Sequence, residues 1–157
     1  MAASLDPDGL GVANIGESEG AAESALVGVL GPSTGTASGT CSETTEVEWN
    51  DLSVEFSDGV FTGYRYNQGG FVDLGKLGRP ISGPGTPPLQ TATGAALGMT
   101  LAKVRSLYPP SAFSAEQGGA IVVSGSSPGN RLFLGFFSTA PSTPMSEVKG
   151  GSPCGDI

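Results

Sequence analysis

Two groups of side chains in this chain have the chemical types that hydrolysis requires. Paired carboxyl groups can cleave a glycosidic bond when a cleft holds them, and the chain has a run of acids suited to this: Glu46, Glu48, Asp51, Glu55 and Asp58. In Ser146-Glu147-Val148-Lys149, a Lys one helical turn from a Ser could activate the hydroxyl as an acyl-transfer nucleophile. A small hydrolase using a carboxylate pair or a Ser/Lys pair is therefore one hypothesis for this chain.

Other features of the sequence argue against catalysis. The chain has no histidine, which removes the commonest general base and metal ligand. The Ser/Lys match lies between Pro144 and Gly150 instead of at the start of a helix, and the solvated face of a strand explains the acids more simply. We therefore expect no catalytic residues, no cofactor and no metal site.

A third group has the residue types that dominate protein-binding hot spots, which are Trp, Tyr and Arg. Its members are Trp49, Tyr64, Arg65 and Tyr66. We predict that this chain binds a partner protein through this group. The alternative, that the rings pack in the core, stays open.

The stretch at residues 47–66 is predicted to form the centre of the fold. Apolar and polar residues alternate over residues 52–57, which is typical of a half-buried strand, and Asp58-Gly59 is a strong turn signal. We expect a hairpin in which Phe56 lies opposite Phe61 on the core face.

The register of this hairpin decides which side chains a partner can reach. With Val54 opposite Gly63, strand alternation places Thr62, Tyr64 and Tyr66 on the face away from the core. The two tyrosine rings are therefore expected to be exposed unless a second layer covers them.

Two helices are predicted, each preceded by a capping residue and followed by residues that end a helix. The first follows Ser18 and extends to Gly31-Pro32, and the second follows Thr100 and extends to Pro109-Pro110. After the second helix, strands are predicted at residues 120–123, 131–137 and 147–149.

The two helices begin in similar sequences, Ile15-Gly16-x-Ser18 and Leu97-Gly98-x-Thr100. We predict an α+β fold in which two helices pack on a mainly antiparallel sheet as a tandem pseudo-repeat. A single compact domain would cover residues 1–157. Its parts would be a first helix-plus-sheet unit at 10–66, a Gly/Pro-rich connector at 67–92 and a second unit at 93–157.

The charge of the chain is unevenly distributed. The formal net charge is −8, and residues 1–63 carry eleven acids and no base. This distribution is compatible with a basic protein partner and argues against nucleic acid, whose binding needs clustered Lys and Arg. The alternative is that the acids keep a secreted protein soluble. The sequence has no run of about 18 apolar residues, so we expect no membrane span.

The two cysteines, Cys41 and Cys154, are expected to form a disulfide. An even number of cysteines without a cluster of metal ligands fits an oxidising compartment, so we expect an extracellular or cell-envelope location. The start of the chain lacks a charged segment followed by an apolar core. We therefore expect that a signal peptide is not present in this chain.

Three sequence motifs resemble a group of exported actinobacterial proteins of unassigned function. They are LGMTLAKVRSLYP, the run W-x-x-L-x-V-x-F-x-D-G-x-F, and the closing GGSPC. More distantly, the chain resembles the helix-plus-sheet repeats of BamE/SmpA-type lipoproteins and of the β-lactamase inhibitory protein. This resemblance implies an inhibitor-like, extracytoplasmic protein-binding module without catalytic residues, although the inhibitor-like proteins have more cysteines. A structural envelope component is a further alternative.

Overall fold

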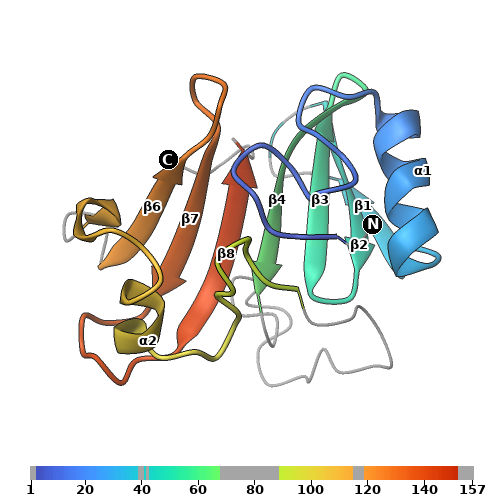
Figure 1. The fold of residues 1–157 in the computed structure, drawn as a ribbon. Coiled ribbons are helices and arrows are strands. Elements are labelled where there is room, and N and C mark those ends of the chain that lie inside the picture. Colours follow the sequence, from blue (N-terminus) through green and yellow to red (C-terminus); the bar gives the residue numbers. More distant parts are fainter. Residues whose placement is uncertain (1–2, 39–40, 42, 68–88, 115–118, 152–157) are drawn as a thin grey trace.

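Eight strands form one sheet in the computed structural model, which describes residues 3–38, 41, 43–67, 89–114 and 119–151 (Figure 1). Their order is β1-β2-β3-β4-β8-β7-β6-β5, and every neighbouring pair is antiparallel. The strands are β1 (Gly35–Ser38), β2 (Thr44–Trp49), β3 (Leu52–Ser57), β4 (Val60–Asn67), β5 (Phe113–Ser114), β6 (Ala120–Ser124), β7 (Arg131–Phe136) and β8 (Met145–Gly151). The expected mainly antiparallel sheet with two α-helices is confirmed.

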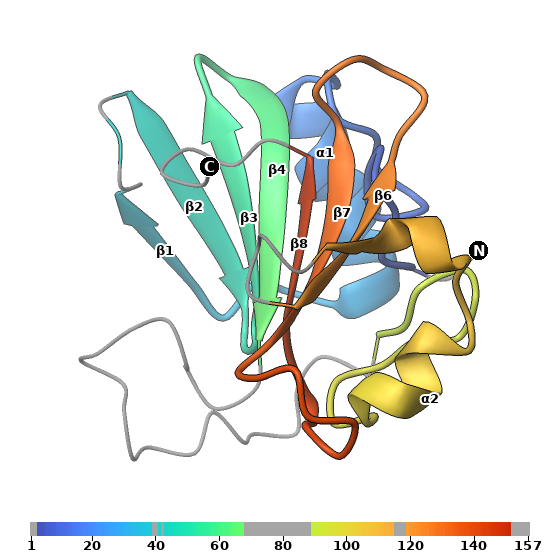
Figure 2. The ribbon, with the colours of Figure 1, turned by 90° about the vertical axis from the view of Figure 1, so that its left-hand side faces the viewer.

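Both α-helices lie on the same face of the sheet (Figures 1 and 2). Helix α1 (Glu19–Leu30) buries Ala22 and Leu26 there, and the short helix α2 (Leu101–Arg105) buries Leu101 and Val104. The α2 helix ends before the predicted Pro109-Pro110 boundary, and a 3₁₀ turn, η3 (Pro110–Ala112), follows. The opposite face of the sheet therefore carries neither of these helices.

The hydrophobic core is built from two rows of side chains that cross six strands on the helix-bearing face. One row is Trp49, Leu52, Tyr66, Val148, Leu134 and Ile121, and the next is Val47, Val54, Tyr64, Gly150, Leu132 and Val123. An N-terminal strap, residues 3–15, lies over these rows and buries Leu5, Leu10 and Ala13 completely. The strap therefore supplies part of the layer that covers the core between the two helices.

The hairpin of β3 and β4 confirms one predicted contact and corrects another. Phe56 and Phe61 are cross-strand partners with ring centroids 5.9 Å apart, as predicted. Val54 pairs with Tyr64 and not with Gly63. The reason is an extra residue in β4: Glu55 and Phe56 are consecutive, but their partners Gly63 and Phe61 are separated by Thr62. This β-bulge shifts the alternation, so Phe61 and Tyr64 both face the core.

Hydrogen bonds to the segment before α1 and to β3 hold the bulge in place. The N–H of Gly16 donates to the Phe61 carbonyl at 2.9 Å, and the N–H of Phe61 donates to the Glu17 carbonyl at 2.9 Å. The hydroxyl of Thr62 donates to the carboxylate of Glu55 at 3.0 Å. A second bulge, at Ser146 in β8, also has a hydroxyl that donates to the neighbouring strand, at the Gly135 carbonyl.

The starts of the two helices make matching contacts with the sheet. The hydroxyls of Ser18 and Thr100 accept bonds from N–H groups three residues later, at 3.3 and 3.2 Å, so both predicted caps are confirmed. Each helix start also bonds to a bulged strand, because Gly98 donates to the Met145 carbonyl as Gly16 does to Phe61.

Some sequence predictions changed or fall outside the described residues. Gly35–Ser38 forms β1, which lies outside the strands predicted from the sequence. The predicted strand at 147–149 is longer, and the strands predicted at 120–123 and 131–137 are present as β6 and β7. Of the predicted connector at 67–92, residues 68–88 lie outside the described part of the chain.

Candidate protein-binding face

Three of the four predicted binding residues are buried in the core. Trp49, Tyr64 and Tyr66 are 1%, 0% and 6% exposed, so the prediction that the tyrosine rings are available on an outer face is wrong. The bulge at Thr62 is the physical reason, since it turns both rings toward the helices. A partner cannot reach these rings in the folded protein.

The polar atoms of these aromatic side chains bind segments that cover the core. The indole N–H of Trp49 donates to the Gly31 carbonyl at the end of α1, at 2.9 Å. The hydroxyl of Tyr64 donates to the carbonyl of Asp6 in the strap, at 2.8 Å. Burial raises the pKa of the Tyr64 hydroxyl well above its usual value, which keeps this donor protonated. These residues therefore anchor the fold.

Arg65 alone of the predicted group lies on the opposite face of the sheet, in a row between the two core rows. This row, called the outer row below, is Glu48, Ser53, Arg65, Lys149, Phe133 and Val122. All six residues are half-buried. Because neighbouring residues along a strand alternate between faces, the outer row points away from the helices.

Two ion pairs and a cation–π contact order the centre of the outer row. Arg65 pairs with Glu46 at 3.2 Å, and Lys149 pairs with Glu147 at 3.3 Å. The ammonium of Lys149 also lies 4.7 Å from the centre of the Phe133 ring. Arg65 and Lys149 are direct cross-strand partners. Like charges in this position repel, and the two flanking glutamates offset that repulsion.

The sheet brings some of the candidate acids together and separates others. Glu46 and Glu55 are cross-strand partners on the outer face, with Glu48 on the same strand as Glu46. Asp51 lies in the turn between β2 and β3, whereas Asp58 lies in the turn at the other end of β3. The structure therefore supplies one adjacent pair of carboxyl groups, at Glu46 and Glu55.

The environment of Glu46 raises the pKa of its carboxyl group. Burial is the main reason that its pKa is raised, and the charges of Glu55 and Glu48 act in the same direction. Arg65 opposes this effect. Burial likewise raises the pKa of Asp51. Glu46 and Glu55 are adjacent, as in a carboxyl pair, but Glu46 also forms an ion pair with Arg65 and so positions that cation.

The Ser/Lys match has the wrong local structure for the predicted chemistry. Ser146 and Lys149 belong to strand β8, so they are not one helical turn apart. The hydroxyl of Ser146 donates to the Gly135 carbonyl at 3.2 Å, and Lys149 pairs with Glu147. Both side chains thus have contacts that support the sheet.

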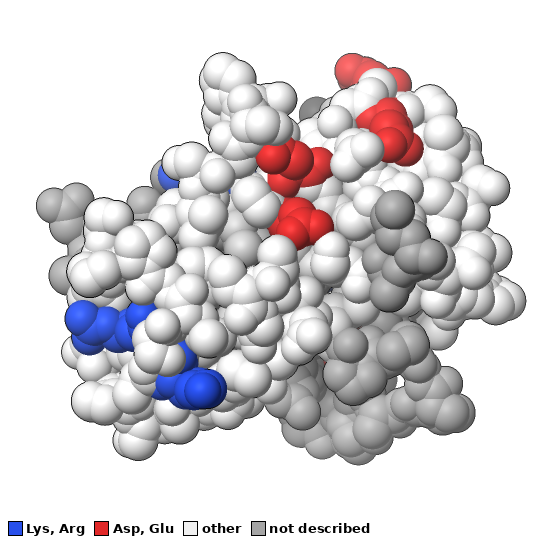
Figure 3. Space-filling view, in the orientation of Figure 1, with Lys and Arg blue, Asp and Glu red and all other residues white. Residues whose placement is uncertain are grey.

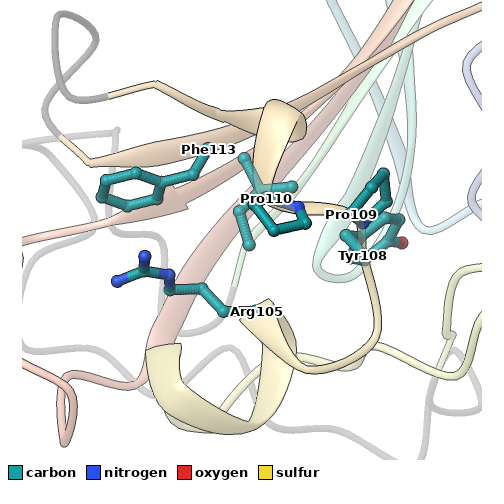
Figure 4. Close-up of a pocket in the computed structure, with 6 residues that line it drawn as sticks. Arg105, Tyr108, Pro109, Pro110 and Phe113 are labelled. Carbon is teal, nitrogen blue, oxygen red and sulfur yellow. The ribbon is translucent and has the colours of Figure 1, made fainter.

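A small hollow lies between α2 and β5 on the helix-bearing side (Figure 4). It is lined by Arg105, Tyr108, Pro109, Pro110, Phe113 and Ile121, and its volume is about 10 Å³. The guanidinium of Arg105 lies 4.1 Å from the centre of the Phe113 ring. This volume holds about one water molecule, which is too little for a substrate.

The charged residues on the helix-bearing face are segregated (Figure 3). Basic side chains gather over α2, where Lys103 and Arg105 are exposed, and acidic side chains lie toward the α1 side. The uneven charge of the sequence is therefore also uneven in space.

Three further predictions concern the cysteines, metal ions and a membrane span. No free thiol occurs among the described residues, which include Cys41, but Cys154 lies outside them, so their pairing stays a prediction. The described residues include no group of three or more Cys, Asp or Glu that could hold a metal ion. None of their helices is long and apolar enough to cross a membrane.

No protein-family model, no curated protein and no solved structure matches this chain. The resemblance to exported and inhibitor-like proteins therefore stays a prediction. Sequence reasoning missed Lys149 and Phe133 as members of the outer face. The alternation Glu147-Val148-Lys149 contained the signal for Lys149, because it places the two charged residues on one face of a strand.

Proposed function

We propose that this chain is a secreted or cell-envelope protein-binding module, inhibitor-like and without catalytic activity, that binds its partner through the outer face of the sheet. The observation that carries this proposal is the outer row, which joins Arg65, Lys149 and Phe133 on three adjacent strands. Arginine and aromatic residues are enriched in protein interfaces. A row held by ladder bonds loses little conformational freedom when it binds.

The shape and charge of the outer face favour a protein over a small molecule. The row extends across six strands, whereas small-molecule sites are concave and enclose most of their ligand. Glu46 and Glu48 lie on the β2 side of Arg65, so basic groups of a partner would be attracted to that part of the face. Phe133 and Val122 supply an apolar part on the other side.

We also propose that the two halves of the chain are copies of one helix-plus-sheet unit. The number of residues between Gly63 and Glu147 is the same as that between Arg65 and Lys149 and between Asn67 and Gly151, so these are equivalent positions of the two halves. Across β4 and β8, Gly63 pairs with Gly151, Asn67 pairs with Glu147, and Arg65 pairs with its own equivalent, Lys149. A two-fold rotation that exchanges the halves requires this pattern of pairs. The matching helix caps and bulges support the same relation. The rotation axis would then pass through the Arg65–Lys149 pair at the centre of the outer row.

The test is partner capture from a native extracellular fraction, with bound proteins quantified by mass spectrometry. The Arg65→Gln/Lys149→Gln variant removes two positive charges from the outer row. The matched control, Lys103→Gln/Arg105→Gln, removes two from α2 on the opposite side. We expect the wild type and the control to retain the same partner and the outer-row variant to lose most of it. Equal capture by all three folded proteins would refute the outer face as the binding site.

The hydrolase alternative has one specific observation in its favour, the adjacent carboxyls of Glu46 and Glu55. It predicts turnover of glycosides that is lost in Glu46→Gln and in Glu55→Gln. We expect no turnover by the wild type. Turnover that both substitutions abolish would overturn the proposal of a non-catalytic module.

A further inference from the structure

The loop between β6 and β7, residues 125–130, surrounds a carboxylate that comes from the other end of the chain. Oδ2 of Asp8 accepts bonds from the N–H of Ser126 at 2.8 Å and from its hydroxyl at 2.9 Å. Oδ1 of Asp8 accepts bonds from the side-chain amide of Asn130 at 3.1 Å and from the N–H of Ser127 at 3.5 Å. Both oxygens of one carboxylate are thus engaged by a single loop.

Gly125 leaves the space that this carboxylate occupies. A Cβ at position 125 would lie 2.5 Å from Oδ1 and 2.9 Å from Cγ of Asp8, closer than atoms can approach without moving. The backbone of Gly125 is not in the left-handed region, so its conformation does not itself require glycine. The close approach of the carboxylate therefore accounts for a small residue here.

The loop also closes on itself without help from Asp8. The N–H of Gly125 donates to the Asn130 carbonyl at 2.8 Å, and the N–H of Asn130 donates to the Ser127 carbonyl at 3.1 Å. These bonds hold the loop and leave the N–H groups of Ser126 and Ser127 directed at the carboxylate. Ser126 and Ser127 are both exposed, so solvent and small ions can reach them.

We propose that the β6–β7 loop is a carboxylate-binding site, filled in this molecule by Asp8 of the strap and open to a free carboxylate when that side chain is removed. Its two N–H groups, one hydroxyl and one amide match the acceptor-only chemistry of a carboxylate. The pKa of Asp8 is lowered, chiefly by the bond from the Ser126 N–H, as expected for a site that favours the charged form. The strap is then an internal ligand of this loop, bound through the Asp8 side chain.

The experiment uses Asp8→Ala, which empties the site and leaves the loop bonds in place. Sodium acetate is titrated against sodium chloride at equal ionic strength, and the amide signals of Ser126 and Ser127 are followed by NMR. We expect saturable shifts with acetate in Asp8→Ala and none in the wild type, where Asp8 occupies the site. Thermal unfolding of the variant should also move to higher temperature with acetate, because ligand binding to the native state stabilises it.

A second variant separates the site from a general effect of acetate. In Asp8→Ala/Gly125→Ala, the new methyl group fills the space of the carboxylate, so the acetate response should disappear. If Asp8→Ala does not fold in chloride, recovery of its near-ultraviolet circular dichroism in acetate is measured instead. Equal responses in Asp8→Ala and the double variant, or no acetate response in Asp8→Ala by any of these measurements, would overturn the proposal.

Discussion

The ring of Tyr64 occupies the space beside Gly150, its cross-strand partner on β8, where any Cβ would collide with the ring and hydroxyl. Tyr64 is completely buried, so its ring could leave this space only by displacing neighbouring core side chains. We expect Gly150→Ala to lower the free energy of unfolding by about 1–3 kcal/mol, the usual cost of overpacking a core. Urea denaturation measures this loss.

The matched control for that substitution is Gly28→Ala in α1. A Cβ at position 28 meets nothing within 4 Å, and alanine favours a helix by about 0.5–1 kcal/mol over glycine. Gly28→Ala should therefore stabilise the protein. A Gly150→Ala variant as stable as the wild type would show that the ring can leave this position.

The two buried tyrosine hydroxyls are expected to differ in what their removal costs. Tyr66→Phe leaves the buried N–H of Leu89 without its acceptor, which costs about 1–3 kcal/mol. Tyr64→Phe removes the donor to the Asp6 carbonyl, which should cost about 0.5–1.5 kcal/mol. Tyr108→Phe, at a half-buried ring bonded to the Thr91 hydroxyl, is the control with the smallest expected loss. Denaturant midpoints in which Tyr108→Phe is the most damaging would contradict this ranking.

The caps of the two helices should contribute similar stability. Ser18→Ala and Thr100→Ala each leave a first-turn N–H without its side-chain acceptor, and each should cost about 0.5–2 kcal/mol. Ser18→Thr and Thr100→Ser retain the acceptor and serve as controls. Thermal unfolding that is insensitive to one of the alanine variants would indicate that this cap has a replacement, such as water.

Asp8 should make stability depend on pH at the acidic end. Its pKa is lowered in the folded protein, so the carboxylate stabilises the fold fully above the unfolded Asp pKa of about 3.9. That stabilisation is lost as the pH falls through the lower folded pKa. The difference in urea midpoint between wild type and Asp8→Asn should therefore be constant near neutral pH and shrink below about pH 3.9.

The control is Asp58→Asn, the same substitution in the turn between β3 and β4. Its urea midpoint as a function of pH shows how much of the pH dependence comes from replacing an Asp with Asn at any exposed turn. A difference between wild type and Asp8→Asn that stays constant down to pH 2 would contradict the role given to the Asp8 carboxylate.

The sequence by itself determined the local elements of this protein. Ser18 and Thr100 cap helices, Asp58-Gly59 forms the turn at which Phe56 meets Phe61, and short apolar runs bounded by Gly, Ser and Pro mark β6 and β7. Each of these features depends on residues that are close together in the chain, so their types and spacing are sufficient to predict them.

Only the tertiary structure decided which face each side chain of the hairpin occupies. Beside the bulge at Thr62, Phe61 accepts a bond from the N–H of Gly16 and donates one to the carbonyl of Glu17, and both residues are distant in sequence. The bulge turns Tyr64 and Tyr66 into the core. A shift of one residue exchanges the two faces of a strand, so alternation alone could not place them. The pairing of Arg65 with Lys149, and the contact of Asp8 with a loop 118 residues away, likewise arise only when the two halves meet.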